Sequence, residues 1–381
     1  MISRKLRQLK YLSPLTSQKG YMLVAALTLM TGLTLLGTTA YILSSTDIKV
    51  GANYKNSQQA LQIAMAGGER ARELLRLENL SSANSGSFSD ELSNVSRRGL
   101  NLVLDGNATP TDDQPIASGT INGISYATYL TNDSSEGTSN TTDTNGQVML
   151  TSVATGTDNA KAVVQTVVKL YQGLSSPAAI YSKGDVTGNG SSLTISGNDE
   201  CGESAALAPI YTKDPATTGL NGNPTLTGSP ATPQNGTLDL AIEAMVESLK
   251  SSAAYTLTDD QNNANYGDSN NYKTVYSDTN NPPNNQGLKL QNVTGYGILL
   301  VKGDLVLGGG FSWYGPILVT GSITLNGGGG GINIRGQILS GTSTLTDVTI
   351  NGGNVIKYNS CEIKKSYAAQ PLTVVNWKHS F

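Results

Sequence analysis

Charged side chains that could perform chemistry are sparse in the C-terminal part of this sequence. The candidates are Lys302, Asp304, Arg335 and Asp347, and the equivalent positions of the internal repeat described below do not carry matching charges. The only histidine is His379. Acid–base catalysis needs such groups gathered around one substrate, and no nucleophile motif, phosphate-binding loop or metal-ligand spacing is present. We therefore expect that the protein is not an enzyme.

One acidic stretch, NDSSEGTSNTTDTNGQ, could supply hard oxygen ligands for Ca²⁺. The candidate ligands are Asp133, Glu136, Asp143 and Asn145. Their spacing does not match the EF-hand loop. The alternative is a solvated hairpin loop, in which these residue types are common. Apart from this weak calcium candidate, no metal or cofactor is expected.

The two cysteines, Cys201 and Cys361, each stand beside a short β-branched segment, in SLTISGNDECG and VIKYNSCEI. Both follow a long apolar segment near the N-terminus. If that segment exports the chain, both cysteines reach an oxidising compartment. We expect a disulfide between them; the alternative is two buried, unpaired thiols.

The apolar segment is long enough to span a membrane. Residues 20–46 contain no charged side chain, and residues 21–43 are mostly apolar, whereas a spanning helix needs about 20 residues. Only basic residues precede it, so the positive-inside rule predicts that residues 1–19 stay in the cytoplasm and the rest is exported. These basic residues are Arg4, Lys5, Arg7, Lys10 and Lys19.

The residues in front of this segment resemble the class III signal of type IV prepilins: a basic leader, then Lys19-Gly20, then Tyr21 opening an apolar helix. The resemblance implies that prepilin peptidase cuts between Gly20 and Tyr21 and that Tyr21 is N-methylated. Two alternatives remain, an uncleaved signal anchor and an ordinary secretory signal. The latter has a shorter apolar core and a small-residue cleavage site, for which only Thr38-Thr39-Ala40 is available.

The helix is expected to continue beyond the membrane, as one helix over residues 21–79 that is roughly 90 Å long. In NYKNSQQALQIAMAGGERARELL, small and apolar residues recur at steps of three and four, which is typical of a helix with one buried face. The glycines of this helix would either let a neighbouring helix approach closely or let the helix bend. The predicted buried residues are Ala60, Ile63, Ala64, Gly67, Ala71, Leu74 and Leu75.

Together, GYMLVAALTLMTGLTLLG and QQALQIAMAGGERA resemble the N-terminal segment of PilX-type minor pilins. Met65 stands where an acid is common in that family. Major pilins carry a glutamate at the fifth residue after the cut, and this chain has Ala25 there. PilX-type minor pilins and the K-type pseudopilins of type II secretion also resemble each other in lacking this acid, which implies a subunit at or near the filament tip.

The resemblance implies a structural and assembly role in a type IV pilus. The implied partners are other minor pilins, the major pilin, prepilin peptidase and the inner-membrane assembly machinery. The implied location is the inner membrane, in a single pass with a cytoplasmic N-terminus, and then the extracellular pilus, with a periplasmic or extracellular head. A tip adhesin or ligand-binding protein and a K-type pseudopilin are the alternatives. No nucleic-acid partner is expected, because the net charge is -3 and the basic residues cluster at the N-terminus.

After loops and one short helix in residues 80–118, the sequence predicts a small antiparallel sheet. Residues 120–133 alternate like a strand, and GQVMLTSVATG and AKAVVQTVVKLY predict a hairpin. Further on, ILLVKGDLVL, PILVTGSITL and QILSGTSTL align on Gly303, Gly321 and Gly341. Such short repeats bury a core when they stack as rungs of a β-helix.

A fourth copy, AAIYSKGDVTGNGSSLTISG, would make residues of about 200–290 an insertion, with one helix in TLDLAIEAMVESLK. Between rungs, Phe311, Trp313 and Tyr314 form either a surface aromatic patch for a ligand or a cap over the core.

The expected fold class is α+β, with a long pilin-like helix, a small antiparallel sheet and a glycine-rich β-solenoid. The expected divisions are a leader peptide (1–20), the helix (21–79, with its membrane span at 21–43), a pilin-like region (80–172) and a solenoid domain (173–381).

Overall fold

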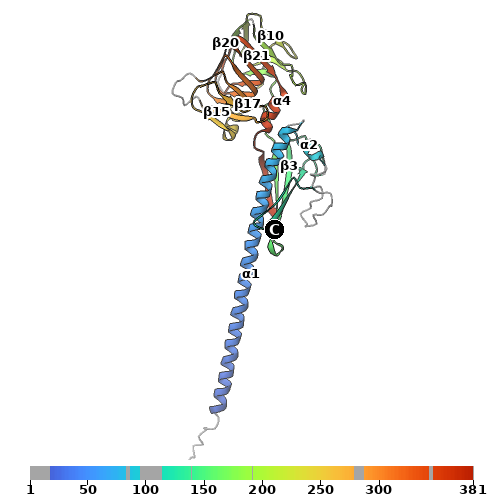
Figure 1. The fold of residues 1–381 in the computed structure, drawn as a ribbon, viewed down its shortest axis with the longest axis vertical. Helices are drawn as coiled ribbons and strands as arrows, with labels where there is room; N and C mark the ends of the chain where they lie inside the picture. The colour runs from blue at the N-terminus through green and yellow to red at the C-terminus, as the bar shows by residue number, and fades with distance from the viewer. Residues whose placement is uncertain are drawn as a thin grey trace, which may run out of the picture.

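The structure is a computed structural model that describes residues 18–82, 86–94, 114–138, 140–190, 192–278, 287–342 and 346–380. It has the expected α+β class. A long helix forms a stalk, a small sheet lies along its C-terminal half, and a β-solenoid stands beyond the end of the helix (Figure 1). Most of the expected leader peptide, residues 1–17, lies outside the described residues.

The stalk is the helix α1 (Gln18–Ser81). Its C-terminal half has the predicted buried face, because Ala60, Ile63, Ala64, Ala71 and Leu75 are buried against the small sheet. Gly67 is also buried, and Leu74 is half-buried. The periodicity of the sequence therefore located this face correctly.

The small sheet is five-stranded and antiparallel, in the order β1-β2-β3-β4-β22. A short helix α2 (Ser89–Ser93) closes one end of its core, and a turn η2 (Thr157–Asn159) joins β3 to β4. The strands are β1 (Ala117–Ile121), β2 (Ile124–Asn132), β3 (Gln147–Thr155), β4 (Lys161–Lys169) and β22 (Thr373–Ser380).

Two features of this sheet differ from the prediction. The single strand expected over 120–133 is a hairpin, because Asn122 and Gly123 have φ of 51° and 81° and turn the chain between β1 and β2. Positive φ at both central residues is what a tight two-residue hairpin turn requires. The edge strand β22 was assigned to the solenoid domain, but it returns to pair with β4. The solenoid domain therefore ends before Thr373.

The solenoid is a 17-stranded parallel assembly with three faces. The first face contains β12 (Tyr255–Leu257), β15 (Lys273–Asp278), β17 (Thr294–Lys302), β19 (Phe311–Val319), the end of β20 (Ile323–Ser340), β5 (Ala178–Ser182), β8 (Ala208–Lys213) and β11 (Gln234–Gly236). The second contains β13 (Gln261–Asn262), β16 (Leu288–Gln291), β18 (Leu305–Gly308), the start of β20, β21 (Val348–Tyr358), β6 (Val186–Asn189) and β9 (Thr218–Asn221). The third contains β14 (Asn265–Tyr266), the starts of β17 and β19, the middle of β20, the end of β21, β7 (Thr194–Ser196) and β10 (Thr225–Thr227).

The rungs do not stack in the order of the sequence. The chain enters at β5, which pairs with the end of β20, and winds outward through β8 and β11. It then passes through α3 (Ile242–Leu249) and η3 (Lys250–Ser252) to β12 at the other end, and winds back to β21. The predicted insertion of about 200–290 is therefore wrong, because residues 208–236 and 255–278 contribute rungs of the same solenoid. The helices α3 and η3 lie between these two sets of rungs.

Two helices cover the outer side of the first face. Ile242, Val246 and Leu249 of α3 and Tyr367 of α4 (Ser360–Ala368) are buried there against outward-pointing side chains such as Leu300. From α4 the chain continues through residues 369–372 into β22. The connection from β4 to β5, residues 170–177, is the other crossing between sheet and solenoid.

Candidate functional site

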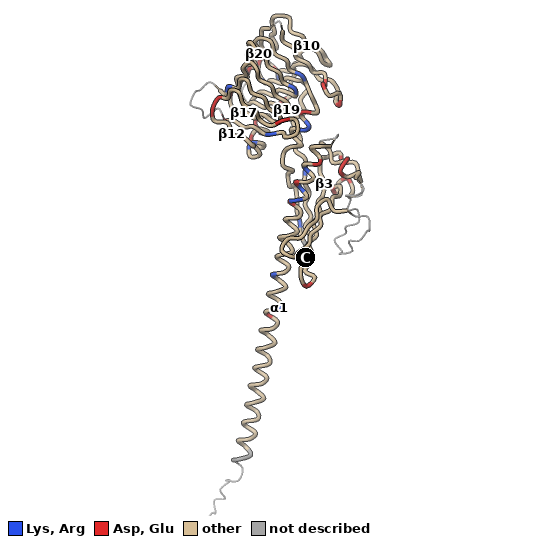
Figure 2. Tube along the Cα trace, in the orientation of Figure 1, with Lys and Arg blue, Asp and Glu red and all other residues tan. Residues whose placement is uncertain are grey.

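The N-terminal half of α1 is the most distinctive surface of the molecule. From Tyr21 the helix is long and apolar enough to cross a membrane, and its apolar part is wholly exposed. Between Tyr21 and Thr46 this helix carries no charged side chain, and the next charged residues are Asp47 and Lys49. Figure 2 shows most of the lower stalk without charged residues. Tyr21 is 76% exposed, and both Tyr21 and Ala25 lie on this bare part of the helix, with Gly20 in its first turns. An uncovered apolar surface of this size marks a membrane or protein interaction site.

Threonine hydroxyls in this segment are satisfied within the helix. The hydroxyl of Thr34 donates to the carbonyl of Met30 across 2.7 Å, and that of Thr39 donates to the carbonyl of Leu35 across 2.8 Å. Thr28, Thr38 and Thr46 bond to their own helix in the same way. Because an unsatisfied hydroxyl is costly in an apolar environment, these bonds make the segment compatible with membrane anchoring.

The stalk is joined to the head by side chains of α1 that bond to the residue 369–372 connection. Arg76 Nη1 donates to the carbonyl of Ala369 across 3.0 Å, and Arg72 Nη1 donates to that of Leu372 across 3.4 Å. On its other side, Gln370 exchanges hydrogen bonds with Thr274 of the solenoid and accepts one from Ser252. One connection is thus fixed to both parts of the molecule.

The four calcium candidates lie together in one loop between β2 and β3, where their oxygens accept hydrogen bonds from the chain. Asp143 accepts bonds from the backbone N–H groups of Phe88 (2.7 Å) and Gly146 (2.7 Å). Asp133 accepts from the Ser135 N–H and the Asn145 amide, and Glu136 from the Thr144 N–H. Burial opposes ionisation of Asp133, but the bonds from Ser135 and Asn145 outweigh it and hold the pKa of this carboxyl group below its usual range.

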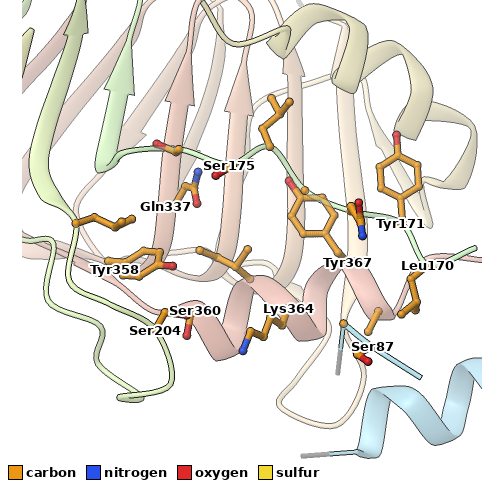
Figure 3. Close-up of a pocket in the computed structure, with 18 residues that line it drawn as sticks. Ser87, Leu170, Tyr171, Ser175, Ser204, Gln337, Tyr358, Ser360, Lys364 and Tyr367 are labelled. Carbon is orange, nitrogen blue, oxygen red and sulfur yellow. The ribbon is translucent and has the colours of Figure 1, made fainter. Parts of the chain in front are cut away.

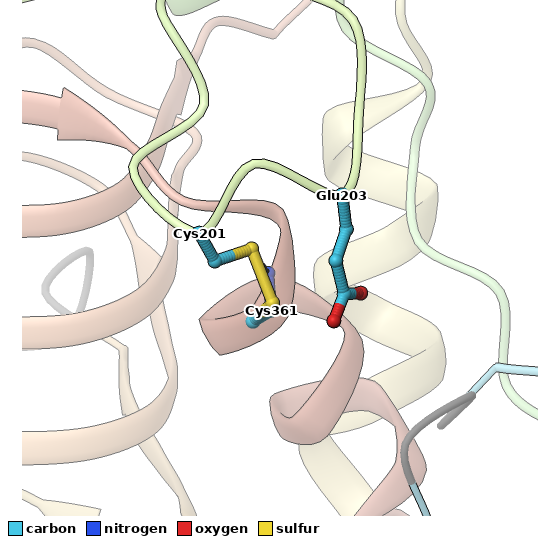
Figure 4. A group of neighbouring side chains, drawn as sticks. All are labelled: Cys201, Glu203 and Cys361. Carbon is cyan, nitrogen blue, oxygen red and sulfur yellow. Dashed lines mark hydrogen bonds between the residues drawn. A yellow bond between two sulfur atoms is a disulfide. The ribbon is translucent and has the colours of Figure 1, made fainter.

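The cysteines form the Cys201–Cys361 disulfide, with a Cα–Cα distance of 6.2 Å. It joins the loop after β7 to the first turn of α4. Glu203 lies beside it (Figure 4), where its carboxylate pairs with Lys364 across 3.0 Å. Both sulfurs are used in the bond, so this group has no thiolate to offer a metal ion.

Of the two alternatives for the aromatic residues between rungs, a surface patch is wrong for Phe311 and Trp313. Phe311 and Trp313 are both 0% exposed and belong to the core inside the solenoid, where their rings stack with centroids 5.9 Å apart. Tyr314 points the other way and stacks on Tyr296 at 4.2 Å. The physical reason is strand alternation: Phe311 and Trp313 start β19, and residues two apart share one face.

The charged rung residues do not converge on one place. Lys302 pairs with Glu247 of α3 across 2.9 Å, and Arg335 pairs with Glu200 across 2.7 Å. Asp304 Oδ1 accepts a hydrogen bond from the backbone N–H of Ser322. Asp347 Oδ1 accepts one from the backbone N–H of Asp185. In β22, the ring of His379 stacks on Trp377. Each of these side chains is used in a separate structural contact.

No protein-family model and no curated protein matches the chain. Among solved structures, it is similar to an ice binding protein from an Antarctic biological consortium, with 12% identity and a TM-score of 0.25 over 51% of this chain and 96% of that chain. It is also similar to the competence-associated pilin ComZ from Thermus thermophilus, with 12% identity and a TM-score of 0.23 over 85% of this chain and 98% of that chain. TM-scores this low do not establish a common fold.

Proposed function

We propose that the protein is a minor pilin of a type IV pilus that acts in filament assembly at or near the tip and displays its solenoid head. The observation that carries the proposal is the division of α1 into an exposed apolar half and a half that packs on an antiparallel sheet. A globular core does not need the exposed half. A subunit that leaves a bilayer to pack into a helical filament does need it.

The residues at the start of α1 support a specific route into the filament. Prepilin peptidase would cut between Gly20 and Tyr21 on the cytoplasmic side and methylate Tyr21. The protein would then stand in the inner membrane, with its sheet and solenoid outside, until the assembly machinery brings it together with other minor pilins and the major pilin. Ala25 supports a terminal position, since a subunit with no neighbour above it has no amino terminus to neutralise.

The role we propose is structural, without catalysis or a metal cofactor. The charged rung residues are spread over separate ion pairs and turns, which gives no cluster for acid–base chemistry. The described carboxylates of the acidic loop accept backbone N–H groups. A display role is favoured by the position of the solenoid, which stands beyond the end of α1 and away from its apolar half (Figure 1).

The deciding experiment is the N-terminal mass of the protein from native membranes, with and without prepilin peptidase. We expect a chain that starts at methylated Tyr21 in the first strain and an uncut chain in the second. Gly20→Val should block the cut. Gly32→Val is the control and should not block it, because Gly32 lies away from the cleavage site and a side chain there would meet nothing within 4 Å of its Cβ. An intact Met1 in both strains, or a start at Tyr41, would overturn the proposal.

The alternatives are separated by deletion. Loss of pili on deletion of the gene supports an assembly role, and loss of protein secretion with pili intact indicates a K-type pseudopilin. If deletion of the solenoid alone abolishes attachment and leaves pili intact, the protein is an adhesin.

A further inference from the structure

A cavity of about 480 Å³ lies where the solenoid meets the sheet. Its walls come from the residue 170–176 crossing, the loop at 204–207, the outer side of β20 and helix α4 (Figure 3). Clefts that bind small molecules have volumes of about 300–1,000 Å³ and often occur between domains. The cavity is therefore large enough for a small ligand. Its location is independent of the apolar helix.

Gln337 of β20 lines this cavity, and its amide nitrogen is buried without a partner among the described residues. Its side chain is only 4% exposed. Two residues further along the same strand, the outward side chain is Leu339, which is covered in the usual apolar way. A buried amide N–H left without a partner is unfavourable, because it has lost its hydrogen bonds to water. A ligand that accepts a hydrogen bond from Gln337 would remove this cost.

The cavity walls are aromatic and rich in hydroxyl groups. Tyr171 and Tyr367 stack with ring centroids 6.2 Å apart, and Tyr358 lines the opposite part of the wall (Figure 3). Gly173 lies so close to Tyr367 that a Cβ there would collide with its ring. This glycine lets the crossing lie flat beside the tyrosine. Five serines also line the cavity: Ser87, Ser175, Ser176, Ser204 and Ser360. The hydroxyls of Ser87, Ser176 and Ser360 already donate to oxygens of the chain and can only accept from a ligand.

The lining has little net charge. Lys364 is the charged side chain on it, and Glu203 pairs with it across 3.0 Å. Among the described lining residues there is no carboxylate. An anionic ligand would find one cation that is already paired, and a cationic ligand would find no carboxylate. Aromatic faces with amide and hydroxyl groups suit an uncharged ligand that has both apolar and polar sides.

We propose that this junction cavity binds a neutral saccharide. The C–H face of a sugar ring would pack on tyrosine, Gln337 Nε2 would donate to a sugar oxygen, and the serine hydroxyls would bond to the remaining hydroxyls. This inference goes beyond the proposed pilus role and does not depend on it, because it concerns neither cleavage nor assembly.

The test uses the full-length chain in detergent micelles with a panel of short neutral sugars: lactose, maltose, cellobiose and diacetylchitobiose. Digalacturonate serves as the anionic comparison. Binding is measured by saturation-transfer NMR and then by titration calorimetry. We expect at least one neutral sugar to bind, and Gln337→Leu, which keeps the size of the side chain, to weaken that binding roughly tenfold. Ser175→Trp, at an exposed position on the cavity rim, should abolish it.

The control is Gln234→Leu, a half-buried glutamine of β11 that lies outside this cavity. It should bind sugar like the unchanged protein. Circular dichroism shows whether each variant is folded, and Ser175→Trp keeps the test valid if Gln337→Leu fails to fold. The proposal is overturned if no neutral sugar binds, if only digalacturonate binds, or if a sugar binds equally well to both cavity variants.

Discussion

Gly67 of α1 lies directly against Tyr126 of β2. A Cβ atom on Gly67 would come within 2.5 Å of Tyr126 Cδ2 and 2.8 Å of Ser152 Oγ. The next residue, Gly68, has much more room, because its Cβ would approach Ser152 Cβ no closer than 3.9 Å. The helix glycines could either allow close approach of a neighbour or bend the helix. Gly67 allows the helix to approach the sheet closely.

This pair of glycines gives the first prediction. Both Gly67→Ala and Gly68→Ala gain the same helix propensity, about 1 kcal/mol, but only the first overpacks the contact with Tyr126. We expect Gly67→Ala to be less stable than Gly68→Ala by about 1–3 kcal/mol. Urea unfolding of the full chain in detergent, followed by circular dichroism, measures the difference. Equal stabilities would mean that α1 does not sit this close to the sheet.

The parts of the fold that the sequence predicted are those coded locally. The buried stripe of α1 follows from a spacing of three and four residues, and the rungs around Gly303, Gly321 and Gly341 follow from a repeat. The hairpin turn at Asn122-Gly123 was also coded locally, but the alternation on both sides of it suggested one strand. An Asn-Gly pair between alternating segments is a strong hairpin signal.

Other features depend on contacts between residues that are distant in the sequence. Nothing near Thr373 indicates that β22 leaves the solenoid and pairs with β4. The rungs within residues 208–236 lack the Lys-Gly-Asp sequence found in ILLVKGDLVL and AAIYSKGDVTG, so the repeat alone indicates an insertion there. The burial of Phe311 and Trp313 did have a signal, because an aromatic residue at every second position fits a strand with one inward face.

The unpredicted pair Asn79 and Glu91 leads to a pH prediction. Glu91 is 3% exposed, and Asn79 Nδ2 donates to its Oε1 across 3.1 Å. Burial raises the pKa of Glu91 to about 7, while its own backbone N–H and the Asn79 amide oppose the rise. Among the described residues, Asn79 Oδ1 and Glu91 Oε2 have no partner. Protonation would turn the Glu91 carboxylate into a carboxylic acid, whose O–H could donate to an unpaired acceptor such as Asn79 Oδ1.

Because the folded state holds this proton more tightly than the unfolded chain, the contribution of Glu91 to stability is largest below about pH 4.5. It falls as the pH rises through about 7, by about 3 kcal/mol at most. Glu91→Gln should remove this part of the pH dependence. Exposed Glu243 on α3 is the control, and Glu243→Gln should keep it. Unfolding free energies measured from pH 4 to 8 would contradict the prediction if Glu91→Gln and the unchanged protein gave parallel profiles.

The acidic loop gives a metal prediction. Since Asp143 and Asp133 already accept hydrogen bonds from the chain, we expect neither millimolar Ca²⁺ nor a chelator to change the melting temperature. Bound calcium at 100 times its Kd would add about 2.7 kcal/mol and raise the melting temperature measurably. Asp143→Ala should lower stability by about 1–3 kcal/mol with or without Ca²⁺, because it leaves the buried N–H of Phe88 unpaired.

The disulfide closes a loop with a sequence separation of 160 residues. Replacing both cysteines by serine should lower the unfolding free energy by about 2–5 kcal/mol, since the unfolded chain regains the freedom that the bond removes. The variant should still fold, because Asp199 joins the same two segments by accepting bonds from the Ser360 N–H (2.8 Å) and the Ser360 hydroxyl (2.7 Å). Denaturant unfolding of the double variant, compared with the unchanged protein under oxidising and reducing conditions, measures the effect. Reduction should bring the unchanged protein to the level of the variant, and a variant as stable as the oxidised protein would show that the bond contributes nothing to the solenoid.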